Sequence, residues 1–272
     1  MVRGYRINGV KRKKTEKAED DRSFEEEEEK EVIVDEEREK GGKDEEEEVQ
    51  LFGIPTGPID QKAKSGIIFV LERASLEVAK VGKTYQILNC DDHATYLKKK
   101  NRDPAAYRPD IIHQALLAVL DSPLNKAGRL KAVYVQTEKN VLIRVNPHVR
   151  IPRTIKRFCG LMVQLLQKLS IRATNGPDIL LRVVKNPVTR HLPIDSRRIG
   201  LSYSSPKVVQ LHDYVTDAKD DVNLVFVVGA MAHGKITADY IDDFISVSEY
   251  PLSAACCIGR ICNVVERKWN IL

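Results

Sequence analysis

Residues 226–236 read FVVGAMAHGKI, and this stretch decides which fold the sequence predicts. A continuous apolar run, typical of a buried strand, ends at Gly229, and Gly234 and Lys235 follow after four intervening residues. The spacing is close to the phosphate-binding loop GxxxxGK[ST], which joins a strand to a helix. Because Ile236 stands where that loop needs a hydroxyl for magnesium, the stretch is either a defective nucleotide-binding loop or a glycine turn for another ligand.

The residues that follow the glycine turn argue against a nucleoside triphosphatase. The segment ITADYIDDF brings acidic side chains that would repel a bound phosphate. A strand-to-helix turn would need only positive φ angles or close packing at Gly229 and Gly234. Such a turn is compatible with a ligand, because glycine lets the backbone approach a flat molecule and offer it N–H and C=O groups.

Strand-like and helix-like patterns alternate along the rest of the chain. Strands are predicted in 67–71, 132–137 and 141–147, with the last two paired, and further elements in 179–188 and 199–205. Helices are predicted from Pro109, over 150–171 after a proline, and over 253–269. This alternation predicts an α/β fold with a mainly parallel sheet, in which ligands bind beyond the carboxyl ends of the strands. Residues 229–235 lie at such an end.

Charge is distributed unevenly between an acidic tail and a basic body. Of the 44 Lys/Arg and 39 Asp/Glu, 12 and 19 lie in residues 1–50, which leaves a net charge of −7 there and +12 over residues 51–272. Runs such as EEEEE (25–29) have little apolar surface to offset the entropy of ordering, so we predict a disordered tail over residues 1–62 and one domain over 63–272. The cluster KRKK (11–14) is either a nuclear localisation signal or a solvated charge run.

Cysteine and apolar patterns limit the class of protein. The five cysteines form no CxxC pair and the six histidines are scattered, so we expect reduced thiols and no metal site. No apolar stretch of about 18 residues occurs, so we expect no transmembrane helix and no membrane partner, and the N-terminal residues lack the apolar region of a secretory signal.

A basic region in the body predicts a nucleic-acid partner. Residues 98–198 contain 21 basic and six acidic residues. On the predicted helix Arg153 and Arg157 share a face, and Arg150 precedes them. Arginine binds phosphate bidentately and stacks on bases, which suits RNA. Near Pro109, Asp110 is either a cap or ion-pair partner of a nearby arginine such as Arg108, or a hydrogen-bond acceptor for a base.

Five blocks of the chain resemble the nucleolar essential protein family over about residues 64–272. They are CDDHATYLKKKNRDPAAYRPDIIHQALLAVLDSPLNKAG, VNPHVRIPRTIKRFCGLMVQLLQKLSIR, VVGAMAHGK, SEYPLSAA and WNIL. Members of this family are pseudouridine N1-methyltransferases of small-subunit ribosomal RNA. The resemblance implies a SPOUT-type α/β fold with a C-terminal trefoil knot, a homodimer, and S-adenosylmethionine held in the knot.

The resemblance also implies site residues. Residues expected to bind the cofactor are Leu201, Gly229, Gly234, Val247, Ser248, Glu249, Tyr250, Pro251 and Leu252. Residues expected to contact RNA are Arg108, Asp110, Arg150, Arg153 and Arg157. Asp110 is in addition the candidate for orienting the flipped base or taking the N1 proton.

The family's role implies a place in the cell and leaves one alternative open. We expect a nuclear, nucleolar enzyme of small-subunit biogenesis, with small-subunit rRNA and pre-ribosome assembly factors as partners. The alternative is an assembly factor whose main role is RNA binding rather than catalysis.

Overall fold

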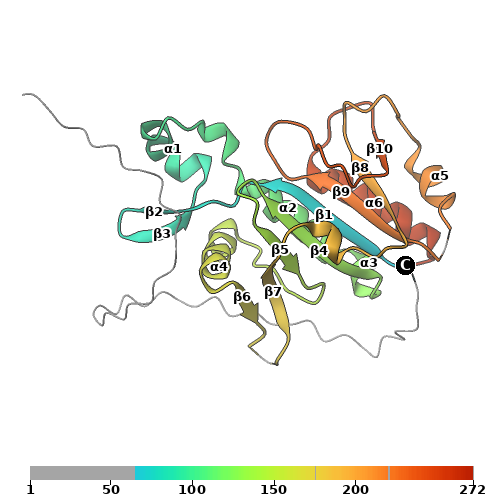
Figure 1. The fold of residues 1–272 in the computed structure, drawn as a ribbon, viewed down its shortest axis with the longest axis horizontal. Helices are drawn as coiled ribbons and strands as arrows, with labels where there is room; N and C mark the ends of the chain where they lie inside the picture. The colour runs from blue at the N-terminus through green and yellow to red at the C-terminus, as the bar shows by residue number, and fades with distance from the viewer. Residues whose placement is uncertain (1–64, 175, 220, 272) are drawn as a thin grey trace, which may run out of the picture. The chain divides into compact units, whose positions relative to one another are not determined.

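The computed structural model describes residues 65–271 apart from residues 175 and 220 (Figure 1). The tail predicted at 1–62, together with the KRKK cluster, lies outside the described residues. The α/β fold predicted for the body is confirmed. In the part of the chain that is described, no helix is long and apolar enough to cross a membrane.

An eight-stranded sheet forms the centre of the domain. Its strand order is β10-β8-β9-β1-β4-β5-β7-β6. The strands are β1 (Ile67–Ala74), β4 (Leu130–Thr137), β5 (Leu142–Val145), β6 (Ser170–Arg172), β7 (Ile179–Val184), β8 (Ser196–Leu201), β9 (Asn223–Gly229) and β10 (Asp243–Ile245). A separate antiparallel hairpin consists of β2 (Val78–Val81) and β3 (Thr84–Ile87).

The sheet has a parallel half and an antiparallel half. β1 pairs in parallel with β4 and β9, and β8 pairs in parallel with β9 and β10. Figure 1 shows β1 in cyan between β9 and β4. Residues 67–71 and 224–228 are buried throughout. Because both faces of these strands are covered, each stretch is a continuous apolar run in the sequence. β4 and β5 form the predicted antiparallel pair.

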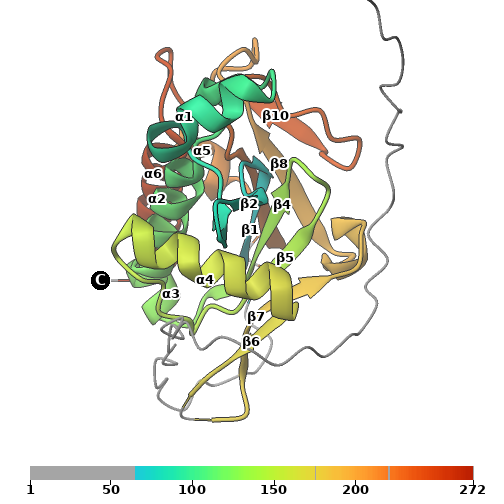
Figure 2. The same cartoon turned by 90° about the vertical axis from the view of Figure 1, so that its left-hand side faces the viewer.

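The helices are α1 (Cys90–Lys99), α2 (Pro109–Leu120), α3 (Pro123–Lys126), α4 (Ile155–Lys168), α5 (Leu211–Thr216) and α6 (Ala254–Lys268), with 3-10 turns at η1 (Pro104–Ala106) and η2 (Val188–His191). Of these, α2 to α6 place apolar residues on one face of the sheet. Figure 2 shows α2, α4 and α6 on the same side of the strands. Their apolar residues, among them Ile112, Phe158 and Ile258, form one core with Phe69 and Phe226.

The opposite face of the sheet carries a second apolar cluster. Val70, Tyr134 and Val227 pack there against Val188 of η2 and Ile236 of the segment that follows β9. This face is therefore covered by irregular segments, and one of them is the stretch 230–242 that contains Gly234.

The helix predicted after the proline within 150–171 is confirmed as α4, but it is shorter than predicted at both ends. α4 begins at Ile155, because Thr154 takes the N-cap position with an extended backbone. It ends where Leu169 adopts a left-handed φ of 60°, and residues 170–172 are a strand. Arg153 therefore lies before the helix, and the predicted helical face shared by Arg153 and Arg157 does not exist.

Candidate functional site

A cavity of about 170 Å³ lies at the carboxyl ends of β8, β9 and β10. Three segments that follow these strands form its walls, at the edge where ligands bind in α/β sheets. The residues that line it are Leu201, Ser202, Tyr203, Val228, Gly229, Met231, Gly234, Lys235, Ile236, Ile245, Ser246, Val247, Ser248, Tyr250, Leu252, Ala254 and Cys257.

The glycine stretch forms one wall, and its two glycines are required for different reasons. Gly234 has φ +108°, a conformation that residues with a side chain rarely adopt. At Gly229, a Cβ would instead approach the Met231 Sδ to 2.9 Å. No helix follows Lys235 among the described residues up to β10. The strand–loop–helix arrangement of a phosphate-binding loop is thus missing, and the nucleotidase interpretation is wrong for this stretch.

A turn after β10 forms the facing wall. The Ser246 hydroxyl donates to the Ser248 carbonyl oxygen at 2.8 Å, and the Tyr250 backbone N–H donates to the Ser248 hydroxyl at 3.0 Å. Ser253 caps α6, as its hydroxyl accepts from the Cys256 N–H at 3.2 Å. These bonds fix a wall of small side chains and backbone groups beside apolar Leu252.

Seven of the nine residues expected to bind a cofactor meet in this cavity. They are Leu201, Gly229, Gly234, Val247, Ser248, Tyr250 and Leu252. Glu249 and Pro251 belong to the same turn but do not line the cavity. Sequence reasoning missed Met231, Lys235 and Ile236, although they lie within the quoted stretch.

The cavity combines apolar walls with a backbone that is free of bulky side chains. Leu201, Ile236 and Val247 supply the apolar part. Gly229 and Gly234 line it without adding a side chain. Among the described residues no group of His, Cys, Asp or Glu is arranged to hold a metal ion. This lining suits a ligand that has a flat apolar part and a polar edge.

The end of β1 holds the glycine stretch in place. The Glu72 carbonyl oxygen accepts from the Ala230 N–H at 2.7 Å, and the Glu72 carboxylate accepts from the Tyr240 hydroxyl at 2.6 Å. Burial raises the pKa of Glu72, and the bond from Tyr240 partly opposes that rise. The Arg73 guanidinium donates to the Lys235 carbonyl oxygen at 3.4 Å.

Arg108 and Asp110 form a bidentate ion pair at the start of α2. The Arg108 Nε lies 2.8 Å from Oδ1 of Asp110, and its Nη2 lies 2.7 Å from Oδ2. The hydrogen bond from Arg108 holds the pKa of the Asp110 carboxyl below its usual range. A carboxylate held in this way is a weaker base, but it fixes the plane of the guanidinium beside it.

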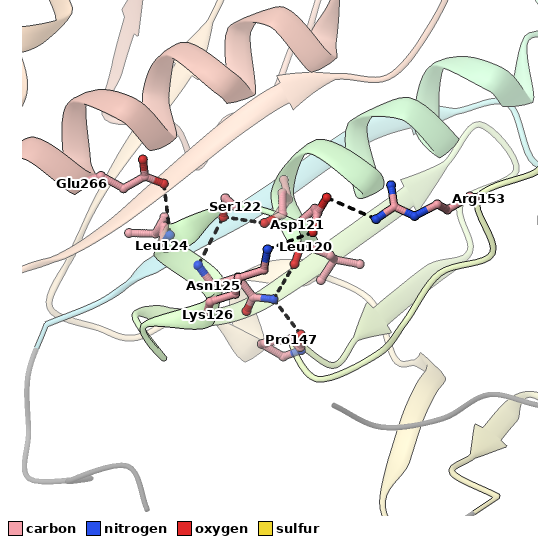
Figure 3. A network of polar contacts seen from close by, with 10 residues as sticks. Leu120, Asp121, Ser122, Leu124, Asn125, Lys126, Pro147, Arg153 and Glu266 are labelled. Carbon is pink, nitrogen blue, oxygen red and sulfur yellow. Dashed lines mark hydrogen bonds and ion pairs between the residues drawn. The ribbon is translucent and has the colours of Figure 1, made fainter. Parts of the chain in front are cut away.

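Arg150, Arg153 and Arg157 are exposed around the start of α4. Arg153 exposes 79% of its side chain and contacts the Asp121 carboxylate at 3.4 Å, as Figure 3 shows. Such an exposed pair is worth little in stability, so Arg153 is available to a phosphate.

Polar contacts and one buried ring hold the arginine segment against α2. The Asn125 amide donates to the carbonyl oxygens of Leu120 and Pro147, each at 2.9 Å (Figure 3). Farther along, His113 Nε2 lies 2.8 Å from the Pro152 carbonyl oxygen, and its ring stacks on Phe158. α2 therefore carries the Arg108–Asp110 pair and supports the other arginines, and none of these residues lines the cavity in the described chain.

Comparisons with known proteins agree with this architecture. A model of the EMG1/NEP1 methyltransferase family matches residues 69–266. The chain is 53% identical over 206 residues to the human protein named ribosomal RNA small subunit methyltransferase NEP1. This alignment covers 76% of this chain and 83% of the human protein. A Candida albicans protein of the same name is 49% identical over 218 residues, covering 77% and 81%.

A solved structure shares the fold. The structure described as Archaeoglobus fulgidus Nep1 bound to S-adenosylhomocysteine aligns with a TM-score of 0.62 at 24% identity, covering 75% of this chain and 99% of the archaeal one. The SPOUT-type α/β fold implied by the sequence resemblance is thereby confirmed. From the family match and the human relative together, we conclude that the chain belongs to the EMG1/NEP1 methyltransferase family.

Proposed function

We propose that the protein is an S-adenosylmethionine-dependent methyltransferase that methylates N1 of a pseudouridine in small-subunit ribosomal RNA during biogenesis of that subunit. The observation that carries the proposal is the cavity at the carboxyl ends of β8, β9 and β10, which gathers seven of the nine expected cofactor residues. Relatives named as ribosomal RNA small subunit methyltransferases support it.

The residues of the cavity fit the proposed cofactor by their chemistry. Leu201, Val247 and Leu252 offer apolar contact to an adenine ring. The backbone at Gly229 and Gly234 offers hydrogen bonds to a polar edge, and neither position carries a side chain that would fill the space. When bound, S-adenosylmethionine supplies a methyl group already activated by its sulfonium.

The remaining task of the chain is to hold the base. Pseudouridine is joined to ribose through carbon, so its N1 carries a proton; as the methyl group passes to N1, its bond to sulfur breaks, the N–C bond forms and the proton leaves to water. Arg150, Arg153 and Arg157 are exposed for phosphate contacts, and the fixed guanidinium of Arg108 suits a phosphate or a base edge. Because the pKa of Asp110 is held low, we propose that Asp110 orients Arg108 and the flipped base, rather than storing the N1 proton.

Several further expectations stay proposals. We propose a homodimer, a nucleolar location with pre-ribosome assembly factors as partners, a domain spanning 63–272 behind an acidic tail, and a trefoil knot in the C-terminal part. Support for the knot is the strand order β10-β8-β9, in which the last strand pairs with the far edge of β8.

Calorimetric titration tests the proposed cofactor. We expect the protein to bind S-adenosylmethionine and not ATP with magnesium, and Gly234→Trp to abolish binding by filling the cavity. Gly82→Trp is the matched control, since Gly82 also has a positive φ, of 66°, but lies in the β2–β3 turn with open space around it. Wild-type binding of ATP and not S-adenosylmethionine would contradict the proposal.

A second candidate function is RNA binding without catalysis as the main role in assembly. It is favoured by the exposed arginines, because none of them lines the cavity. Under this alternative, Gly234→Trp would leave RNA affinity and subunit assembly intact, whereas Arg153→Glu would impair both. Loss of assembly in the Gly234→Trp variant, with RNA affinity retained, would exclude it.

A further inference from the structure

The segment 230–242 between β9 and β10 forms a wall of the cavity without any helix or strand of its own. It supplies Met231, Gly234, Lys235 and Ile236 to the lining. Ile236 anchors its middle, since this side chain is buried against the sheet. An irregular segment of this length keeps one conformation only where specific contacts hold it, so the contacts at its two ends decide the shape of the cavity.

Glu72 contacts the first residue of this segment and Tyr240 near its other end, where Asp242 is held by Arg198. Its backbone carbonyl oxygen accepts from Ala230, the first residue, at 2.7 Å. Its carboxylate accepts from the hydroxyl of Tyr240, near the last residue, at 2.6 Å, across 168 positions of sequence. Glu72 belongs to β1, which lies in the middle of the sheet and pairs on both sides. Glu72 itself pairs with Gly229 of β9, beside an irregularity in the pairing of β1 with β4.

We propose that Glu72, through its hydrogen bond with Tyr240, is a positioning residue that holds segment 230–242 in the conformation that binds the methyl donor. The inference rests on the proposed function, because it assigns the cavity to that ligand. Glu72 does not line the cavity and acts through the segment that does.

Physical reasons make the Tyr240 bond more than a surface contact. Tyr240 packs against the apolar cluster on this face of the sheet, and the Glu72 carboxylate is partly buried. Burial disfavours the carboxylate, as the raised pKa of Glu72 shows, and the phenol hydroxyl replaces part of the lost hydration. Without it the carboxylate gains from turning toward water, which loosens the segment around Tyr240, whereas Asp242 stays bonded to Arg198. A ligand that binds only the ordered conformation then binds more weakly, because its apparent affinity is multiplied by the fraction of molecules in that conformation.

The decisive variant is Tyr240→Phe, which removes one hydroxyl and leaves the ring in place. We expect its affinity for S-adenosylmethionine, measured by calorimetry, to fall by about ten- to a hundredfold, since hydrogen bonds to charged groups carry free energies of that order. Its affinity for an RNA hairpin, bound through the arginines, should not change. Tyr134→Phe is the matched control, because the Tyr134 hydroxyl donates to the His191 carbonyl oxygen at 3.3 Å on the same face of the sheet.

Substitutions of Glu72 separate positioning from simple destabilisation. Glu72→Gln keeps an oxygen that accepts from Tyr240 and should bind the donor nearly as wild type, whereas Glu72→Ala should resemble Tyr240→Phe. Hydrogen exchange of the wild type and Tyr240→Phe should show faster exchange at 231–241 in the variant, with β1 unchanged. This measurement also decides the matter if Glu72→Ala does not fold.

The outcomes distinguish this inference from the proposed function. Loss of affinity in Tyr240→Phe but not in Tyr134→Phe, with rescue in Glu72→Gln, supports the inference. Wild-type affinity and wild-type exchange in Tyr240→Phe overturn it while leaving the proposed function intact. A wild-type protein that binds no S-adenosylmethionine overturns both.

Discussion

Replacing Gly234 by alanine should destabilise the domain through backbone strain. The size of this destabilisation follows from the φ angle of Gly234. Gly234 has φ +108°, outside the conformations that an alanine adopts without strain. A left-handed conformation costs an L-residue about 1–2 kcal/mol. For a domain of this size, 1 kcal/mol lowers the midpoint of thermal unfolding by roughly 2–4 °C. We therefore expect Gly234→Ala to unfold about 2–8 °C below the wild type.

Two comparison variants identify the origin of that cost. The added Cβ would lie 2.7 Å from the Arg73 Nη1, the end of a flexible side chain that is free to turn away. Arg73→Ala should therefore not rescue Gly234→Ala. Gly229→Ala should cost less than Gly234→Ala, because Gly229 has no positive φ and its Cβ would meet the movable side chain of Met231 and, at an ordinary 3.6 Å, Ile236.

Differential scanning calorimetry measures the melting temperatures of the wild type, Gly234→Ala, Gly229→Ala and the double variant with both Arg73→Ala and Gly234→Ala. The backbone explanation is refuted if Gly234→Ala melts with the wild type. It is also refuted if Arg73→Ala restores the melting temperature of Gly234→Ala, since the cost would then come from the contact with the guanidinium.

Three further predictions concern the groups around the site. Glu72 has a raised pKa, so its contribution to stability is present below its unfolded pKa and is lost as pH rises through its folded pKa. In thermal melts, Glu72→Gln should therefore be at least as stable as the wild type at pH 7, where the wild-type carboxylate is charged. This advantage should disappear near pH 4, where Glu72 is protonated. Arg73 has φ +58°, and Arg73→Gly should stabilise by about 0.5–1 kcal/mol in urea unfolding, since its exposed pair with Glu138 and its exposed 3.4 Å bond to the Lys235 carbonyl oxygen contribute little; a destabilised variant would refute this. Arg153→Ala should weaken binding of a hairpin RNA and reduce the slope of log affinity against log salt by about 0.7–0.9, whereas an unchanged slope would mean that Arg153 contacts no phosphate.

Local patterns predicted much of the fold because local physics governs those elements. The apolar runs at 67–71 and 224–228 are strands because both faces of the parallel half are covered. The helical spacing after Pro109 predicted α2, and proline fits the first turn of a helix. The helix predicted over 253–269 is α6, and its start is favoured by Ser253, whose side chain caps it.

Other features depend on partners distant in sequence, and no local pattern contains them. β10 has three residues and exists because β8 offers it an edge. The start of α4 was placed slightly too early, because Arg153 fits the helical spacing although Thr154 takes the N-cap position. The bond between Glu72 and Tyr240 joins segments 168 positions apart.

The candidate site was predicted unevenly for the same reason. The resemblance to a family identified the glycine turn and the turn after β10, whose residues meet in one cavity. Spacing alone suggested a phosphate loop, since a glycine pattern does not reveal whether a helix follows. The role of Asp110 depended on the orientation of Arg108, which only the structure provides.

The central claim is tested most directly by methyl transfer to RNA. Two hairpins of identical sequence would be used, one with a single pseudouridine and one with uridine at that position, together with isotopically labelled S-adenosylmethionine and mass analysis of the nucleosides. We predict one methyl group on N1 of pseudouridine, none on uridine, whose N1 is bonded to ribose, and no product with Gly234→Trp. Equal methylation of both hairpins, or none by a wild-type protein that binds both the RNA and the methyl donor, would contradict the proposed function.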